Sequence, residues 1–140
     1  MAIKSFIFFA FILLSGCTDN SIVNIKDKTL LTQKIPCMRL LVFPPNILIE
    51  QKLKTLYPFK EKCDINFLVS YKSGIVCNSN QNSNNKALGM PSSYLRYELK
   101  KHNRLLYSYY IDLDGPITQQ DINDGFDRIK KDLTFTTSKQ

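Results

Sequence analysis

Few residues in this chain could carry out acid-base or metal chemistry. Asp112 and Asp114 are two residues apart, a spacing that puts both carboxylates on one face of a strand, where they could act as a pair. Gly115-Pro116 follows directly, so a turn is the favoured interpretation. The single histidine, His102, falls in a predicted turn. We therefore expect no catalytic residue, no metal site and no cofactor, and we predict a non-catalytic protein.

The N-terminal segment predicts export. Lys4 is followed by an uninterrupted apolar run over residues 6–14, and small residues lead to Cys17. A positive start, a short apolar core and small residues at a cleavage point are the three parts of a secretory signal peptide. The apolar run is about half of the roughly 20 residues that a transmembrane helix requires, which disfavours a spanning anchor.

The sequence Leu14-Ser15-Gly16-Cys17 resembles the lipobox of bacterial lipoproteins. This resemblance implies that residues 1–16 are removed and that Cys17 receives a diacylglycerol and anchors the protein to a membrane. An ordinary signal peptide with a coincidental cysteine is the alternative. Thr18 stands where an aspartate would favour inner-membrane retention, so the resemblance favours the outer membrane of the cell envelope. It covers only the processing signal and implies no activity.

Length and composition predict one small domain behind a tether. Removing 16 residues from the 140-residue chain leaves 124, enough for one modest core. We predict a polar, flexible tether over residues 17–34, one domain over residues 35–135 and a disordered tail over residues 136–140. Loss of Lys4 lowers the net charge from +7 to +6. The charges are dispersed and no recognition motif is present, so nucleic acid is not expected as a partner.

The first half of the domain predicts a strand, a helix and a second strand. Residues 37–43 form a short apolar run that ends at two prolines, as is typical of a buried strand. Asn46 is a favourable N-cap for a helix that ends near Tyr57. Residues 65–71 alternate between apolar and polar side chains. The order strand, helix, strand favours parallel pairing with a right-handed crossover.

The cysteines after Cys17 predict one disulfide in an oxidising, exported setting. Cys37 and Cys63 both stand at the beginning of a predicted parallel strand, hence at the same end of the sheet, and they are the preferred pair. A turn or bulge at Ser73-Gly74 is followed by a short extra strand over residues 75–77, which ends at Cys77, and this cysteine is left over. Other connectivities stay open at this point. No C-x-x-C pair is present, so neither a thioredoxin-like site nor a zinc site is predicted.

The clearest pattern is a β-hairpin over residues 95–113, in which both arms carry apolar side chains at odd positions. Directly opposed residues share a face, so two odd-numbered sets require a loop with an odd number of residues, such as His102–Arg104 or Lys101–Asn103. The odd-numbered tyrosines are predicted to be buried; they are Tyr97, Tyr107 and Tyr109.

The even-numbered face of this hairpin is the predicted binding site for a partner. It carries Tyr94, Arg96, Leu106 and Tyr110. Tyrosine and arginine beside an exposed apolar residue are enriched in interface hot spots, so we expect contact with another envelope protein, as an assembly or stability factor. The alternative is a module that binds envelope glycan or anionic lipid through basic residues, namely Lys100, Lys101, Arg104, Arg128, Lys130 and Lys131.

The C-terminal segment predicts an amphipathic helix. Thr118 and Asp121 have the spacing of a capping box. One apolar stripe follows, formed by Ile122, Phe126, Ile129 and Leu133. Gly125 lies beside this stripe, where the lack of a side chain allows close approach to the sheet. These elements together predict a small α+β domain of order β-α-β-(β)-β-β-α, with two helices packed on one face of a mixed sheet.

Overall fold

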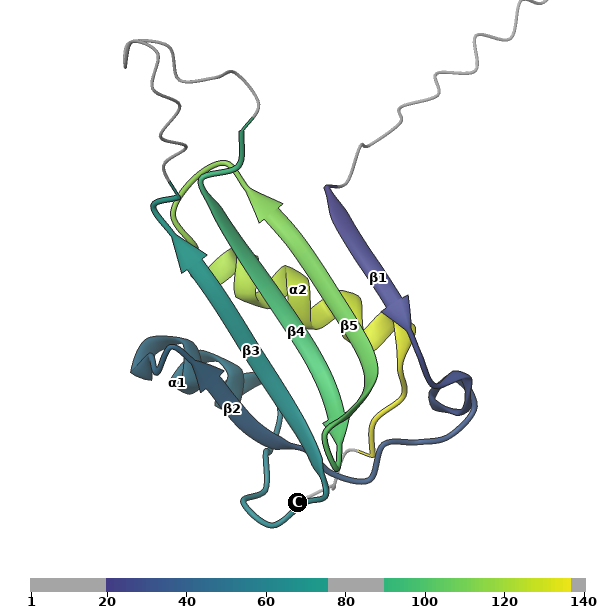
Figure 1. The fold of residues 1–140 in the computed structure, drawn as a ribbon. Coiled ribbons are helices and arrows are strands. Elements are labelled where there is room, and N and C mark those ends of the chain that lie inside the picture. The colour runs from purple at the N-terminus through teal and green to yellow at the C-terminus, as the bar shows by residue number, and fades with distance from the viewer. Residues whose placement is uncertain (1–19, 76–89, 137–140) are drawn as a thin grey trace, which may run out of the picture.

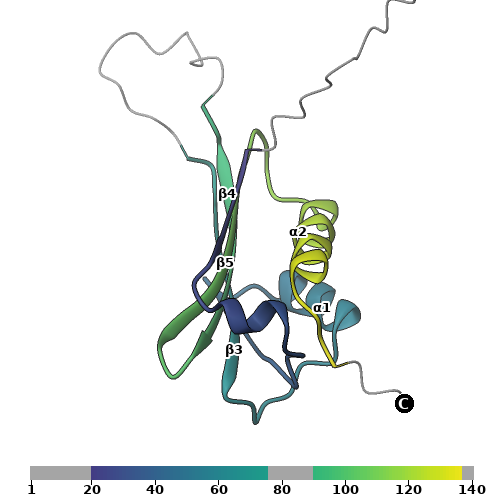
Figure 2. The ribbon, with the colours of Figure 1, turned by 90° about the vertical axis from the view of Figure 1, so that its right-hand side faces the viewer.

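The computed structural model describes residues 20–75 and 90–136, which form one mixed five-stranded sheet with two α-helices. The strands are β1 (Ser21–Ile25), β2 (Arg39–Phe43), β3 (Ile65–Ser73), β4 (Ser93–Lys101) and β5 (Arg104–Leu113). The helices are α1 (Ile47–Leu56) and α2 (Gln119–Asp132), and a 3-10 helix, η1, spans Lys28–Leu31. Both α-helices lie on the same face of the sheet (Figure 2). The predicted α+β class is confirmed.

The strand order across the sheet is β1-β5-β4-β3-β2 (Figure 1). β2 and β3 are parallel, with Leu41 opposite Leu68, and α1 connects them. The three remaining pairs are antiparallel. The predicted parallel pairing is therefore confirmed, and β4 occupies the centre of the sheet.

Both α-helices begin at the predicted caps. The side-chain oxygen of Asn46 accepts hydrogen bonds from the backbone N–H groups of Leu48 and Ile49, at 3.0 and 3.3 Å. In α2, the backbone N–H of Thr118 donates to Asp121 Oδ2 at 2.7 Å, and the N–H of Asp121 donates to Thr118 Oγ1 at 3.2 Å. This reciprocal pair is the predicted capping box, and it satisfies backbone donors that would otherwise be unpaired at the start of the helix.

An aromatic cluster joins α2 to the middle of the sheet. The ring of Phe67 on β3 lies 5.5 Å from the ring of Tyr97 on β4 and 5.7 Å from the ring of Phe126 on α2. All three side chains are fully buried. Tyr97 donates its hydroxyl hydrogen to the backbone carbonyl of Ile122 at 3.0 Å, so its one polar atom is satisfied inside the core. Tyr107 and Tyr109 are also buried, as the alternation predicts.

The hairpin between β4 and β5 has the predicted pairing, but its loop differs from the expected one. Tyr97 lies opposite Tyr109, so the odd-numbered residues do share a face. The connecting turn has two residues, His102 and Asn103, with φ angles of 47° and 64°, as in the primed turns that suit hairpins. The expected odd-numbered loop is wrong. The extra residue lies within the strand as a β-bulge at Leu106, where the register shifts.

The tether predicted over residues 17–34 is also wrong where the structure describes it. β1 pairs with β5, with Val23 opposite Tyr109, and Asp27 caps η1. Leu30 on η1 is buried in the core. Val23 and Ile25 occupy alternate positions and face the core, as in a strand. Ile22, between Ser21 and Val23, is apolar but exposed, so the sequence does not show a clear apolar–polar alternation.

Some expectations fall on parts of the chain that lie outside the described residues. They concern residues 1–19 with Cys17, the segment 76–89 with Cys77, and residues 137–140. Of the expected extra strand over 75–77, Ile75 is described and lies outside the strands, although its N–H donates to the carbonyl of Ser92 at 2.8 Å.

The contact between α2 and β4 predicts a cost for any side chain at position 125. A Cβ on Gly125 would lie 2.5 Å from Tyr97 Cε2, and the Tyr97 ring is held by its buried hydrogen bond. Overpacking costs about 1–3 kcal/mol, whereas alanine improves helix propensity by about 1 kcal/mol. We expect Gly125→Ala to lower the free energy of unfolding by about 1 kcal/mol or more in urea denaturation.

The control is Lys131→Ala, at an exposed position on the same helix. Its free energy of unfolding should lie within about 0.5 kcal/mol of that of the parent protein. A Gly125→Ala protein as stable as the parent would contradict the close contact.

Candidate functional site

The face of the sheet opposite the helices is the candidate binding surface. On it, Arg96 lies opposite Tyr110, and Tyr94 lies opposite Asp112 across the same pair of strands. The rings of Tyr94 and Tyr110 stack with centroids 5.6 Å apart. The structure therefore brings together three of the four residues predicted for partner contact, because their even numbering puts them on one face of β4 and β5.

Leu106, the fourth predicted residue, is not on this surface. It is 3% exposed and belongs to the hydrophobic core. The bulge at Leu106 is the physical reason: an inserted residue shifts the alternation, so even numbering no longer means the open face. The backbone carbonyl of Leu106 accepts hydrogen bonds from Lys26 and Asp27 at 2.9 and 3.0 Å, which fixes the start of the η1 region against the hairpin.

An exposed apolar residue beside the tyrosines comes instead from β1. Ile22 lies opposite Tyr110 in the β1–β5 ladder and is 65% exposed. Sequence reasoning missed this residue because it assigned the segment to a tether. The alternation in Ser21–Ile25 was the only local signal, and it is too short to identify a strand without its pairing partner.

A buried carboxylate lies at the centre of the open face and was also missed. Glu98 on β4 is 4% exposed and forms ion pairs with Arg96 and, at 2.8 Å, with Lys100. A carboxylate loses its hydration when buried, so the two cations must compensate for that loss. The spacing of charges at positions 96, 98 and 100 on one strand was the available signal. The arrangement holds Arg96 in place, while its side chain stays 44% exposed.

Tyr110 is held by Asp112 on the same strand. Its hydroxyl donates to Asp112 Oδ1 at 2.6 Å. This hydrogen bond, together with partial burial and the negative charge of Asp112, raises the pKa of Tyr110 from 10.0 to about 12. At neutral pH the phenol is therefore protonated, and Asp112 serves as its acceptor. The bends at 114–116 match the turn expected after Asp114.

The predicted disulfide between Cys37 and Cys63 is present, with Cα atoms 6.0 Å apart. One residue separates Cys37 from the start of β2, and one residue separates Cys63 from the start of β3, so parallel pairing brings the two cysteines to the same end of the sheet. The disulfide closes the crossover that contains α1. It ties β2, an edge strand, to its neighbour.

The basic residues of the alternative binding mode lie in separate places. Lys101 and Arg104 flank the hairpin turn, whereas Arg128, Lys130 and Lys131 are on α2. Most of the six cations have an acidic partner. The pairs are Lys100 with Glu98, Arg104 with Asp27, Arg128 with Asp132 and Lys130 with Asp127. These ion pairs reduce the charge available to an anionic ligand.

Comparisons of the chain with protein-family models, with curated proteins and with solved structures gave no match. Within residues 20–75 and 90–136, no helix has the length and hydropathy needed to cross a membrane. The same residues contain no group of three or more histidine, cysteine, aspartate or glutamate side chains arranged to hold a metal ion.

The hydrogen bond between Tyr110 and Asp112 predicts a measurable titration. We expect ring-labelled Tyr110 to ionise with a pKa near 12, and Asp112→Ala to return the pKa toward 10.0, as followed by NMR of the labelled ring carbon. Because the pKa is raised on folding, the stabilisation is complete below pH 10 and is lost as the pH rises through about 12. Asp114→Ala is the matched control and should leave the Tyr110 titration unchanged. Equal titrations in both variants would refute the assigned acceptor.

Proposed function

We propose that this protein is a non-catalytic envelope lipoprotein, anchored through Cys17, that binds another envelope protein through the open face of its sheet. The carrying observation is the stacked pair Tyr94 and Tyr110 beside Arg96 on a sheet face that the two α-helices leave uncovered (Figure 2). In this role it acts as an assembly or stability factor for its partner.

The composition of the open face supports a protein partner. Tyrosine and arginine contribute disproportionately to protein interfaces, because they bury large area with few rotatable bonds or form several hydrogen bonds. Here both tyrosines are pre-organised, one by stacking and one by its bond to Asp112. Arg96 is pre-organised by Glu98. Side chains that are already ordered lose less entropy on binding, which favours affinity.

The position of β1 supports a site near the membrane. Four peptide units separate Cys17 from Ser21, the first residue of β1, and they span at most about 14 Å. Ile22 and its neighbour Tyr110 lie at this same end of the strand. An acylated Cys17 would therefore hold the tyrosine pair close to the bilayer, where a membrane protein or another anchored protein is within reach.

The anchor and the partner are tested together in the native envelope. A C-terminally tagged protein is purified after mild crosslinking, and mass spectrometry identifies both its mature N-terminus and the co-purifying proteins. We expect an acylated Cys17 as the first residue. We also expect one partner whose recovery falls about tenfold or more when Tyr94 and Tyr110 are both replaced by alanine.

The control variant is Leu31→Ala, which removes an exposed apolar side chain on η1, beyond the other end of β1. It should leave the recovered partner unchanged. An N-terminus at another residue would refute the anchor. Equal recovery of every partner by the double tyrosine variant would refute the binding surface, and recovery of lipid or glycan without a protein would favour the alternative module.

A further inference from the structure

The outer edge of β2 is an unprotected strand edge. β2 is the last strand of the sheet and pairs only with β3, and the described part of the chain offers no backbone partner on its other side. Exposed edges pair readily with other chains, and natural proteins guard them with short strands, charged side chains, proline, a bulge or a covering helix or loop. β2 contains Leu40, Leu41, Val42 and Phe43 in succession, and Arg39 is its only charged residue.

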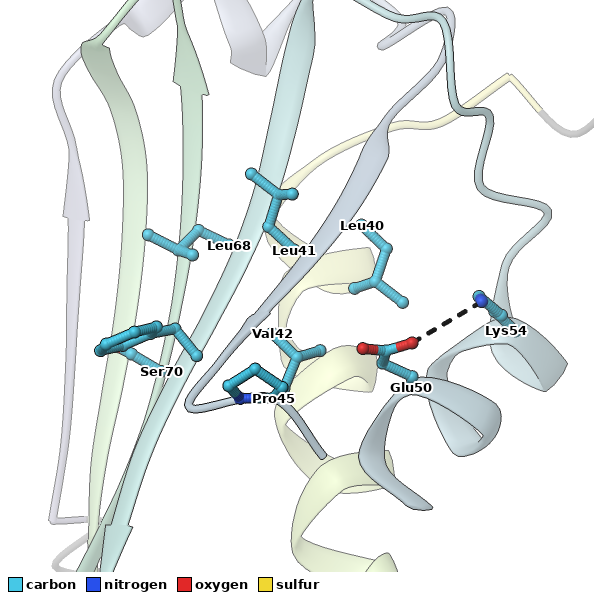
Figure 3. A pocket seen from close by; sticks show the side chains of 9 residues that line it. Leu40, Leu41, Val42, Pro45, Glu50, Lys54, Leu68 and Ser70 are labelled. Atoms are coloured by element: carbon cyan, nitrogen blue, oxygen red, sulfur yellow. Dashed lines mark ion pairs between the residues drawn. The ribbon is translucent and has the colours of Figure 1, made fainter. Parts of the chain in front are cut away.

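A cavity of about 480 Å³ runs along this edge. On the helix side, Leu40 and Val42 point from β2 toward Glu50 and Lys54 of α1, which form the opposite wall (Figure 3). Glu50 and Lys54 pair with each other at 3.8 Å. This volume lies within the range of about 300–1,000 Å³ that is typical of ligand sites. Strand edge and helix thus form a groove that can accommodate one extended chain.

The other side of the edge is apolar and exposed. Leu41 and Leu68 lie on the open face of the sheet beside the groove (Figure 3). Leu41 is 40% exposed and Phe43 is 68% exposed. Exposed apolar side chains that lie together commonly mark binding sites, and Leu41, Phe43 and Leu68 line the same cavity.

Arg39, the first residue of β2, lies beside the cavity and not among its lining residues, and its charge favours an acidic ligand. Arg39 donates from Nε to Asn66 Oδ1 at 2.9 Å, which orients its guanidinium group. Among residues 20–75 and 90–136, Arg39 has no carboxylate partner, whereas Lys54 is paired with Glu50. A fixed guanidinium group is well suited to bind a carboxylate through two parallel hydrogen bonds.

We propose that β2 binds an extended segment of another protein as a sixth, antiparallel strand, with an acidic side chain beside Arg39. Strand addition supplies main-chain hydrogen bonds for affinity and side-chain pockets for specificity. An antiparallel partner runs from Phe43 toward Arg39, so its side chains on the open face follow the order apolar, apolar, acidic at every second position. This site is separate from the Tyr94 and Tyr110 surface and does not depend on it.

The test uses the full-length protein and a synthetic probe, Ser-Ile-Thr-Val-Thr-Glu-Ser, with a control peptide that carries lysine in place of glutamate. Fluorescence anisotropy of labelled peptide measures affinity, and hydrogen exchange with mass spectrometry locates the protected amides. We expect a Kd below about 1 mM for the glutamate probe and protection of residues 39–43. Methylation of alternate backbone nitrogens in the probe should abolish both effects, because it removes main-chain donors.

A charge exchange separates this site from nonspecific apolar binding. Arg39→Glu should weaken the glutamate probe about tenfold and make the lysine peptide the tighter ligand. The protein with alanine at both Tyr94 and Tyr110 is the matched control and should bind the glutamate probe as the parent does. Loss of binding in that control would place the probe on the Tyr94 and Tyr110 surface and overturn the proposal.

Other outcomes also overturn it. These are protection outside residues 39–43, binding that survives backbone methylation, and an unchanged preference after Arg39→Glu. If residues 39–43 are protected in the absence of peptide, and more strongly at higher protein concentration, then a second copy of the chain occupies the edge.

Discussion

The close packing of α2 on the central strand is the constraint on which the rest of this structure depends. Gly125 allows the helix to approach the Tyr97 ring so closely that a single methyl group would not fit without displacement. This approach brings Phe126 into the aromatic cluster with Phe67 and lets Tyr97 bond to the helix backbone. α1 then packs beside α2, so one face of the sheet is buried and the other is left for solvent or a partner.

The open face of the sheet, which neither α-helix covers, carries both charged and aromatic side chains. Arg96 and Lys100 surround Glu98, so the buried carboxylate is neutralised within the strand that carries it. The stacked tyrosines lie next to this charged group. Burial of a charge network is rarely a large source of stability, but it does fix the positions of its members. Arg96 and Tyr110, which are proposed to contact a partner, are thus held in place by Glu98 and Asp112.

The two edges of the sheet are treated differently. At one edge, β1 covers β5 and continues into η1, whose Leu30 closes the end of the core. At the other edge, β2 is tied to β3 by the disulfide, but its side chains are mostly apolar and its outer side pairs with no other strand of the sheet. Both β1 and β2 are edge strands, and β2 is the one that lies beside a cavity and an arginine that has no carboxylate partner among the described residues.

Local signals in the sequence determined both α-helices and their caps, the strands β2 to β5 and the class of the fold. Asn46, the Thr118–Asp121 box and the odd-numbered alternation of the hairpin act over a few residues, and each is confirmed. The preferred disulfide followed from a topological rule about parallel strands and is also confirmed.

Contacts between distant segments decided the rest of the structure. Ser21–Ile25 is a strand because β5 pairs with it, Leu106 is buried because a bulge shifts the register, and the groove at β2 exists because α1 folds back beside a free edge. Periodicity reports which side of an element is apolar, whereas pairing and register depend on which distant segments meet, and a local pattern does not contain that information.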